Sequence, residues 1–111
     1  MMPSLPEPPK AFSAFVKRFP KLDQSWRLAS EAGQTGPLAP ETRLLVKLAL
    51  AAGALREGAV HSAARKALAS GVSLGEMEQV IALSASTLGF PSAVALFSWI
   101  QDEVKKHQGT D

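Results

Sequence analysis

The chain has 111 residues, with 12 basic and 10 acidic side chains and a formal net charge of +2 at pH 7. This length fits one domain, and the share of hydrophobic residues (46%) excludes an intrinsically disordered chain. The absence of cysteine excludes disulfide bonds, thiolate nucleophiles and cysteine-held metal centres. The basic residues are scattered along the sequence and form no stripe, so we expect no nucleic-acid partner.

The first ten residues contain four prolines and predict an extended arm, residues 1–10, in front of a single helical domain, residues 11–108. No apolar segment typical of a signal peptide occurs in this arm, so we expect a cytoplasmic protein. The uncharged stretch between Glu78 and Asp102 is long enough to cross a bilayer. Because Gly89 and Pro91 interrupt it, two buried helices joined by a turn explain it better, and we expect no membrane partner.

Six helical segments and no strand are predicted. The first, Ala11–Phe19, ends because Pro20 cannot continue the hydrogen-bonded ladder. The second runs from Lys21 to Ala32, with Gly33 as its expected C-cap. The third begins at Pro40 and continues to Ala54, and it is apolar on nearly every side, which is typical of a central helix or one buried between subunits.

The fourth segment, Arg56–Ser70, carries a stripe of small residues that lets another helix approach closely, and Gly71 ends it. We expect the third and fourth helices to form the central antiparallel pair. Ser73 and Glu76 form the pattern of a capping box at the start of the fifth helix, which continues to Leu88. After Gly89, Pro91 begins the sixth. The third, fifth and sixth helices carry more apolar surface than a small domain can bury, so we expect a homo-oligomer.

Residues 38–104, about two thirds of the chain, resemble the carboxymuconolactone decarboxylase and alkylhydroperoxidase-D-like family. The resemblance rests on three stretches in the same order and spacing: Pro40–Val46, Ala63–Met77 and Thr87–Ala93. It implies an all-α, alkylhydroperoxidase-D-like domain of about six helices that assembles as a trimer or hexamer.

The peroxidase branch of this family uses a glutamate, a Cys-x-x-Cys pair and a histidine four residues after the second cysteine. An ungapped comparison anchored on Gly71 places these positions at Leu44, Arg56, Ala59 and Ala63. None of the four residue types is retained, so we exclude thiol-dependent peroxide reduction. The decarboxylase branch also lacks the cysteines, although it commonly keeps the histidine. His61 lies two residues before Ala63, about 160° away around an ideal helix.

Glu57, His61 and Arg65 are four residues apart from one another and share one flank of the fourth helix. A carboxylate beside an imidazole is the minimum for proton transfer, so Glu57 and His61 are the candidate catalytic residues. Arg65 is the candidate for binding a substrate carboxylate. The alternative is a solvated helix face stabilised by spaced charges. Arg43 and Lys47, also four apart, are expected to extend from the apolar third helix to the rim of an interface.

Three classes of function stay open: an acid–base enzyme acting on a small organic acid or lactone, a non-catalytic small-molecule-binding protein, and a structural homo-oligomer. A decarboxylase or other lyase would belong to the first class. We expect no cofactor and no metal, since two histidines 46 residues apart without clustered carboxylates provide no ligand set.

Overall fold

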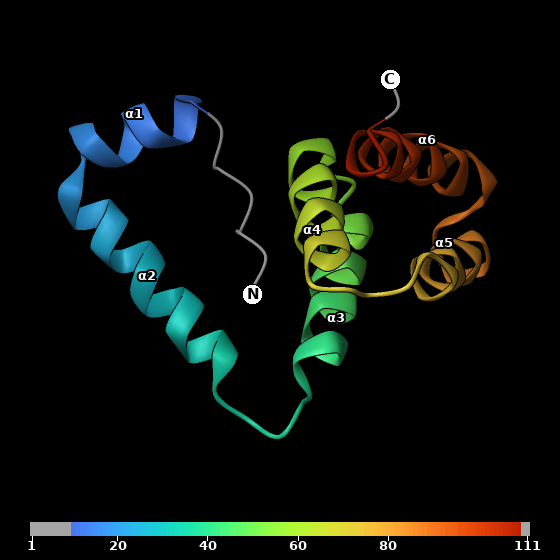
Figure 1. The fold of residues 1–111 in the computed structure, drawn as a ribbon, viewed down its shortest axis with the longest axis horizontal. Helices are drawn as coiled ribbons and strands as arrows, with labels where there is room; N and C mark the ends of the chain where they lie inside the picture. Colours follow the sequence, from blue (N-terminus) through green and yellow to red (C-terminus); the bar gives the residue numbers. More distant parts are fainter. Residues whose placement is uncertain (1–9, 110–111) are drawn as a thin grey trace. The chain divides into compact units, whose positions relative to one another are not determined.

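The structure is a computed structural model, and it describes residues 10–109. Within that range the chain forms six α-helices and no strand, which confirms the all-α prediction (Figure 1). The helices are α1 (Lys10–Arg18), α2 (Pro20–Gln34), α3 (Pro40–Gly53), α4 (Glu57–Ala69), α5 (Leu74–Leu88) and α6 (Phe90–His107). The proline-rich arm expected at residues 1–10 lies outside the described residues, apart from Lys10, which begins α1.

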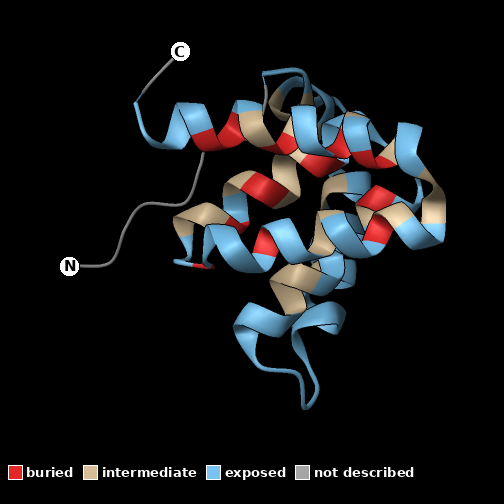
Figure 2. Cartoon of the chain, turned by 90° about the vertical axis from the view of Figure 1, so that its right-hand side faces the viewer, coloured by how far each residue is buried: buried red, intermediate tan, exposed pale blue. Residues whose placement is uncertain are grey.

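Contacts group the described residues into two compact units, residues 10–38 and residues 39–109. Figure 2 shows that the buried positions belong to α3–α6 and to the turn before α5. The single domain expected over residues 11–108 stays a prediction.

The unit of residues 10–38 consists of α1 and α2, which are joined at Pro20, the first residue of α2. Its contacts are aromatic: the rings of Phe12 and Trp26 meet edge to face with centroids 5.4 Å apart. No residue of either helix is buried. The predicted C-cap at Gly33 is wrong, because α2 continues to Gln34 and Thr35 is its C-cap. The left-handed backbone conformation falls instead on Gly36, with φ of 146°.

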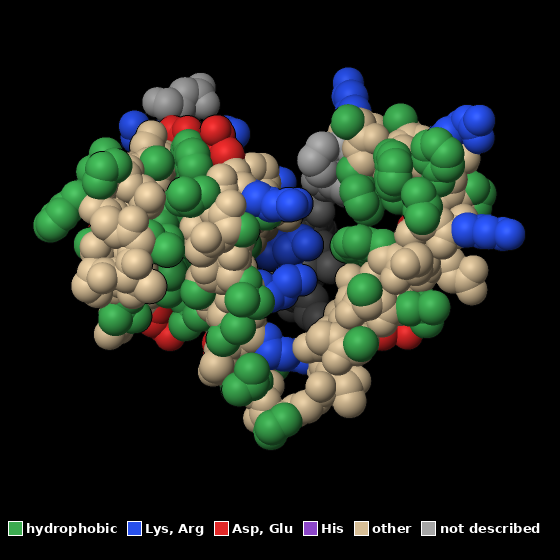
Figure 3. All heavy atoms as spheres, turned by 180° about the vertical axis from the view of Figure 1, so that it is seen from behind, with side chains coloured by type: hydrophobic (Ala, Val, Ile, Leu, Met, Phe, Trp, Pro, Cys, Tyr) green, Lys and Arg blue, Asp and Glu red, His purple; other side chains and the backbone are tan. Residues whose placement is uncertain are grey.

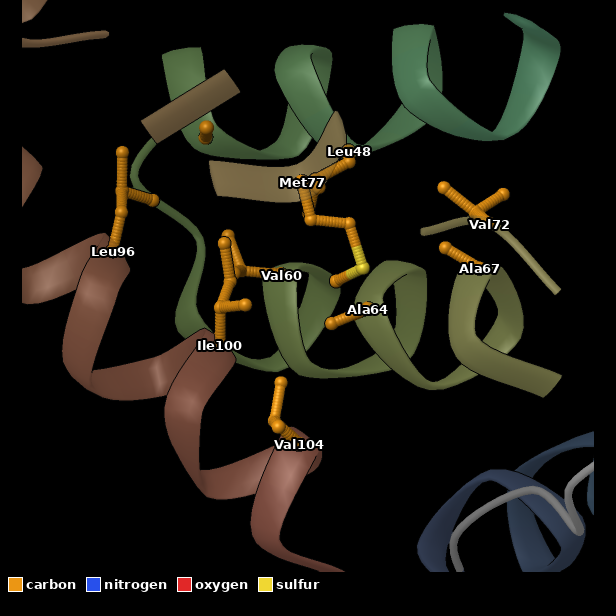
Figure 4. Packing of buried hydrophobic residues seen from close by; sticks show 10 residues of the cluster. Leu48, Val60, Ala64, Ala67, Val72, Met77, Leu96, Ile100 and Val104 are labelled. Atoms are coloured by element: carbon orange, nitrogen blue, oxygen red, sulfur yellow. The ribbon is translucent and has the colours of Figure 1, made fainter. Parts of the chain in front are cut away.

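In the unit of residues 39–109, α3 and α4 run antiparallel and contribute the centre of the core (Figure 4). Helix α4 contacts both α3 and α6, and α5 packs against α6 and α3. The third and fourth helices are therefore neighbours as predicted, but α4 is shared equally with α6. The buried cluster contains Leu48, Ala52, Val60, Ala64, Ala67, Val72, Met77, Leu96, Ile100 and Val104.

The helix ends in this unit follow local sequence signals. Pro40 is the first residue of α3, and the Ser73 hydroxyl accepts a hydrogen bond from the Glu76 backbone N–H at 3.1 Å while the Glu76 carboxylate accepts one from the Ser73 N–H. Gly71 and Gly89 adopt φ of 86° and 96°, which ends α4 and separates α5 from α6. The turn from α3 to α4 has no such glycine, and Leu55 itself takes the left-handed conformation with φ of 52°.

Two large apolar residues next to the core helices are exposed: Leu55 (47%) and Phe97 (49%). The turn conformation of Leu55 takes its side chain off the inward face of α3, and α6 buries Leu96, Ile100 and Val104 in preference to Phe97. Among residues 10–109, no helix combines the length and apolar character needed to cross a membrane. The cytoplasmic location stays a prediction.

Candidate functional site

His61 on α4 contacts a carboxylate through each of its ring nitrogens. Nδ1 lies 2.5 Å from Oε2 of Glu103, and Nε2 lies 3.3 Å from Oε2 of Glu57. Glu103 comes from α6, 42 residues further along the chain, whereas Glu57 is one turn earlier on α4 itself. The imidazole is thus held between two acidic groups from two helices.

Glu103 is the most deeply buried charged side chain among the described residues, at 1% exposure. Its neighbours on α6 explain why it points inward: Ile100 and Val104, three residues before and one after it, are both part of the buried cluster. A buried carboxylate is costly unless charged or polar groups compensate it. Among residues 10–109, those groups are His61 and Arg65 of α4 and Lys106 of α6 itself.

Two cations complete the surroundings of Glu103. A guanidinium nitrogen of Arg65 (Nη1) lies 3.5 Å from Oε1, and the ammonium nitrogen of Lys106 lies 3.6 Å from Oε2. Within the part of the chain that the structure describes, Oε1 is buried and makes no hydrogen bond, although it is within ion-pair distance of Arg65. The carboxylate therefore has one close hydrogen-bond partner, His61, and two longer electrostatic contacts.

Solvent reaches the four residues around Glu103 to different extents. The side chains of His61 and Arg65 are 16% and 32% exposed, while those of Glu57 and Lys106 are 61% and 68% exposed. Solvent exposure therefore increases from the buried carboxylate of Glu103, through the partly buried imidazole of His61, to the exposed side chain of Glu57. An imidazole oriented on one side by a carboxylate, with its other nitrogen near solvent, has the geometry of a general acid or base.

The structure brings together the three residues that sequence spacing singled out, Glu57, His61 and Arg65, and adds Glu103 and Lys106 to them. Arg65 was expected to bind a substrate carboxylate, and here it faces the carboxylate of Glu103. Glu103 was missed by the sequence analysis. An acidic residue on the apolar face of α6, next to Val104, was the available signal.

Two of the four positions that align with the catalytic residues of the peroxidase branch have a structural role here. Leu44 and Ala63 are partly buried and pack against the core cluster, so they help to join α3 and α4. Among residues 10–109, no three His, Cys, Asp or Glu side chains are grouped closely enough to hold a metal ion. The acidic side chains of the site instead contact His61 and the basic side chains of Arg65 and Lys106.

These features define an all-helical protein with a buried glutamate–histidine pair and no thiol. The model of the carboxymuconolactone decarboxylase family matches residues 20–102, which is three quarters of the chain. The chain belongs to this family, as a member without cysteine. The match begins at Pro20 and therefore includes α2, whereas the resemblance seen in the sequence covers only residues 38–104. No curated protein and no solved structure matches the chain.

Proposed function

We propose that the protein is an acid–base enzyme acting on a small organic acid or lactone, with His61 as the group that transfers the proton. One observation carries the proposal: Nδ1 of His61 is paired with the buried Glu103, so that Nε2 is the nitrogen directed toward Glu57 and solvent. A histidine with a purely structural role needs only one hydrogen-bond partner. An ion pair on an exposed helix face does not need a buried carboxylate such as Glu103.

An ionised carboxylate only accepts hydrogen bonds, so Glu103 favours the tautomer in which Nδ1 carries the proton and donates it to Oε2. The lone pair of Nε2 is then available to take a proton from a substrate. Once Nε2 has taken up a proton, it can donate to the carboxylate of Glu57, 3.3 Å away, so Glu57 stabilises the imidazolium that forms. In this assignment Glu103 is a positioning residue, and His61 and Glu57 are the catalytic pair.

The family to which the chain belongs suggests a carboxylated lactone as the substrate class. In a decarboxylation the bond to the carboxylate breaks, carbon dioxide leaves, and the electron pair delocalises onto the lactone carbonyl. The resulting carbanion needs a proton, which Nε2 of His61 first takes up from solvent and then delivers to the carbanion. Arg65 retains N–H groups beyond the one facing Glu103, and its partial exposure supports a role in holding a second substrate carboxylate. Thiol-dependent peroxide reduction is excluded, since the chain has no cysteine.

Turnover of carboxymuconolactone, followed as carbon dioxide release, tests the proposal. We expect His61→Gln to lower kcat/KM by at least about a hundredfold, the usual size of a general acid–base contribution. His107→Gln is the matched control, because His107 is the other histidine and lies exposed in the last turn of α6. Equal activity in the two variants, or no turnover of carboxymuconolactone by the native protein, would contradict the proposal.

A second experiment needs no substrate. In nitrogen NMR spectra of the neutral protein, we expect His61 to show the tautomer protonated at Nδ1 and His107 to show the mixture typical of a solvated imidazole. Glu103→Gln should change the tautomer of His61 and leave that of His107 unchanged. A solvent-like tautomer mixture at His61 in the native protein would remove the structural basis for the assignment.

The second candidate function is a non-catalytic homo-oligomer that binds a small molecule or serves a structural role. It is favoured by the large apolar side chains that α3, α5 and α6 leave exposed: Val46, Leu50, Leu74, Leu83, Phe90, Val94 and Phe97. Such surface is more than an isolated small domain usually presents. We propose a trimer or hexamer, to be measured by native mass spectrometry. A homo-oligomer without turnover of carboxymuconolactone would favour this second function over the first.

A further inference from the structure

Helix α6 is apolar on a second face, beside the one that packs against α4 and α5. Phe90 and Val94 are 77% and 64% exposed, and Phe97 is 49% exposed. Because these residues are four and three positions apart, they lie on one side of the helix. We call these three residues the outer face of α6. Leu83 of the neighbouring helix α5 is 60% exposed as well.

The outer face belongs to a part of the chain without charged side chains, since none occurs between Glu78 and Asp102. Hydrophobic side chains are spread over the part of the unit of residues 39–109 that α5 and α6 form, at the left in Figure 3. Apolar surface that stays in water is usually small and interspersed with charged residues, which keep a protein soluble. An uncharged apolar face of this kind indicates that another surface covers it.

The absence of charge selects the kind of partner. A nucleic acid or a charged peptide is recognised by opposite charges, and residues 79–101 provide none. Helices that lie on lipid surfaces carry Lys or Arg beside their apolar face, and this stretch has neither. A second copy of the chain fits, because an uncharged face meets the same face of another copy without opposing like charges.

The size and symmetry of the outer face fit such a pairing. Covering its three side chains and Leu83 removes roughly 400 Å² of apolar surface from water in each copy. With the exposed residues around them, two copies reach the total of about 1,000 Å² that specific association needs. Val94 lies near the middle of the face, so a twofold axis beside it brings Phe90 of each copy to Phe97 of the other.

We propose that two copies of the chain pair through the outer faces of α6, with the two helices antiparallel about a twofold axis at Val94. The proposal rests on the second candidate function, a homo-oligomer, and is independent of the chemistry assigned to His61. A twofold contact occurs in a hexamer built from two trimers but not in a single trimer. The pairing therefore selects the hexamer from the two assemblies proposed above.

Disulfide cross-linking of the full-length protein tests the pairing, and single cysteine variants are suited to it because the chain has no cysteine of its own. A residue at a twofold axis lies next to its own copy, so Val94→Cys should form a disulfide-linked dimer from most of its chains under mild oxidation. Leu50→Cys is the matched control, since Leu50 of α3 is 69% exposed and lies outside the outer face. It should stay unlinked at the same protein concentration.

Native mass spectrometry completes the test. We expect an even number of copies in the native protein, and Val94→Glu should halve the mass because it places like charges opposite one another at the axis. Equal cross-linking of Val94→Cys and Leu50→Cys, or none in Val94→Cys, would overturn the pairing.

The masses also separate the two proposals. An oligomer that keeps its mass in Val94→Glu would overturn the pairing alone, whereas a native monomer would also overturn the homo-oligomer on which the pairing rests. A native monomer that floats with phosphatidylcholine vesicles in a density gradient would assign the outer face to a lipid surface instead.

Discussion

The carboxylate of Glu103 and the imidazole of His61 lie 2.5 Å apart, and the carboxylate is the more deeply buried of the two, at 1% against 16% exposure. Their contact joins α4 to α6 at a point where both helices otherwise present apolar residues to the core. The pair is therefore part of the packing of the unit as well as of the proposed chemistry, and the two roles can be separated by mutation.

Glu103→Ala should lower the free energy of unfolding by about 3 kcal/mol, since it leaves Arg65 without its counter-charge and Nδ1 of His61 without its hydrogen-bond partner, and opens a gap between the helices. Urea denaturation followed by circular dichroism measures this. Glu57→Ala is the control, because its side chain is 61% exposed and should cost less than about 0.5 kcal/mol. Equal losses in the two variants would mean that the buried position of Glu103 has no energetic consequence.

Two leucines on α3 test the assignment of core and surface. Leu48 is fully buried and Leu50 is 69% exposed. We expect Leu48→Ala to cost about 3 kcal/mol of stability, as large-to-small changes in a packed core do, and Leu50→Ala to cost less than about 0.5 kcal/mol in the isolated chain. Thermal and urea unfolding give the stabilities. If the protein self-associates through α3, Leu50→Ala should also shift the assembly toward monomer in sedimentation, and Leu48→Ala should not.

The capping box makes the stability of α5 depend on pH. Hydrogen bonds from the Ser73 hydroxyl and backbone N–H lower the pKa of Glu76. A lowered carboxyl pKa contributes stability that is present above the unfolded-state value and is lost as pH falls through the folded-state value. Ser73→Ala removes the side-chain N-cap of α5 and should therefore lower the stability of the protein near neutral pH.

The same substitution should reduce the loss of stability between about pH 5 and pH 3, because the pKa of Glu76 is then lowered only by the hydrogen bond from the backbone N–H of residue 73. Urea unfolding at a series of pH values provides the comparison. Parallel stability curves for the native protein and Ser73→Ala across this range would contradict the role of Glu76.

Replacing glycine with alanine should have opposite effects on the stability of the protein at two positions. Gly89, between α5 and α6, has φ of 96°, and a methyl group there would meet nothing closer than Pro91 at 4.0 Å. Gly89→Ala should therefore cost about 1 kcal/mol through its backbone conformation alone. Gly75, in the first turn of α5, has open space around it, so Gly75→Ala should add about 0.5 kcal/mol. A gain in stability for Gly89→Ala would mean that this turn adopts another conformation.

The parts of the fold that the sequence predicts are those specified by neighbouring residues. Pro40, the Ser73–Glu76 pair and Gly89 each act through their own backbone or through one within a turn of it, and the structure has helix ends at all three. Gly33 misled the prediction because a glycine can also stay helical, and nothing near it forces a turn.

The contacts of the candidate site divide in the same way, into one that local spacing specifies and one that the packing of helices specifies. The contact of Glu57 with His61 follows from a spacing of four residues on one helix, and it is observed at 3.3 Å. The contact of His61 with Glu103 spans 42 residues and depends on how α4 packs against α6, which no local pattern specifies.

The absence of buried residues in α1 and α2 has a consequence for exchange of amide hydrogens with solvent. Amides of the two helices should exchange through frequent local opening, since no buried side chains have to separate first. Amides beside Leu48, Val60 and Ile100 should exchange only when the whole unit of residues 39–109 unfolds. A partner or ligand that covers α1 and α2 would then be detected as slowed exchange in these helices, even where it changes no other property of the protein.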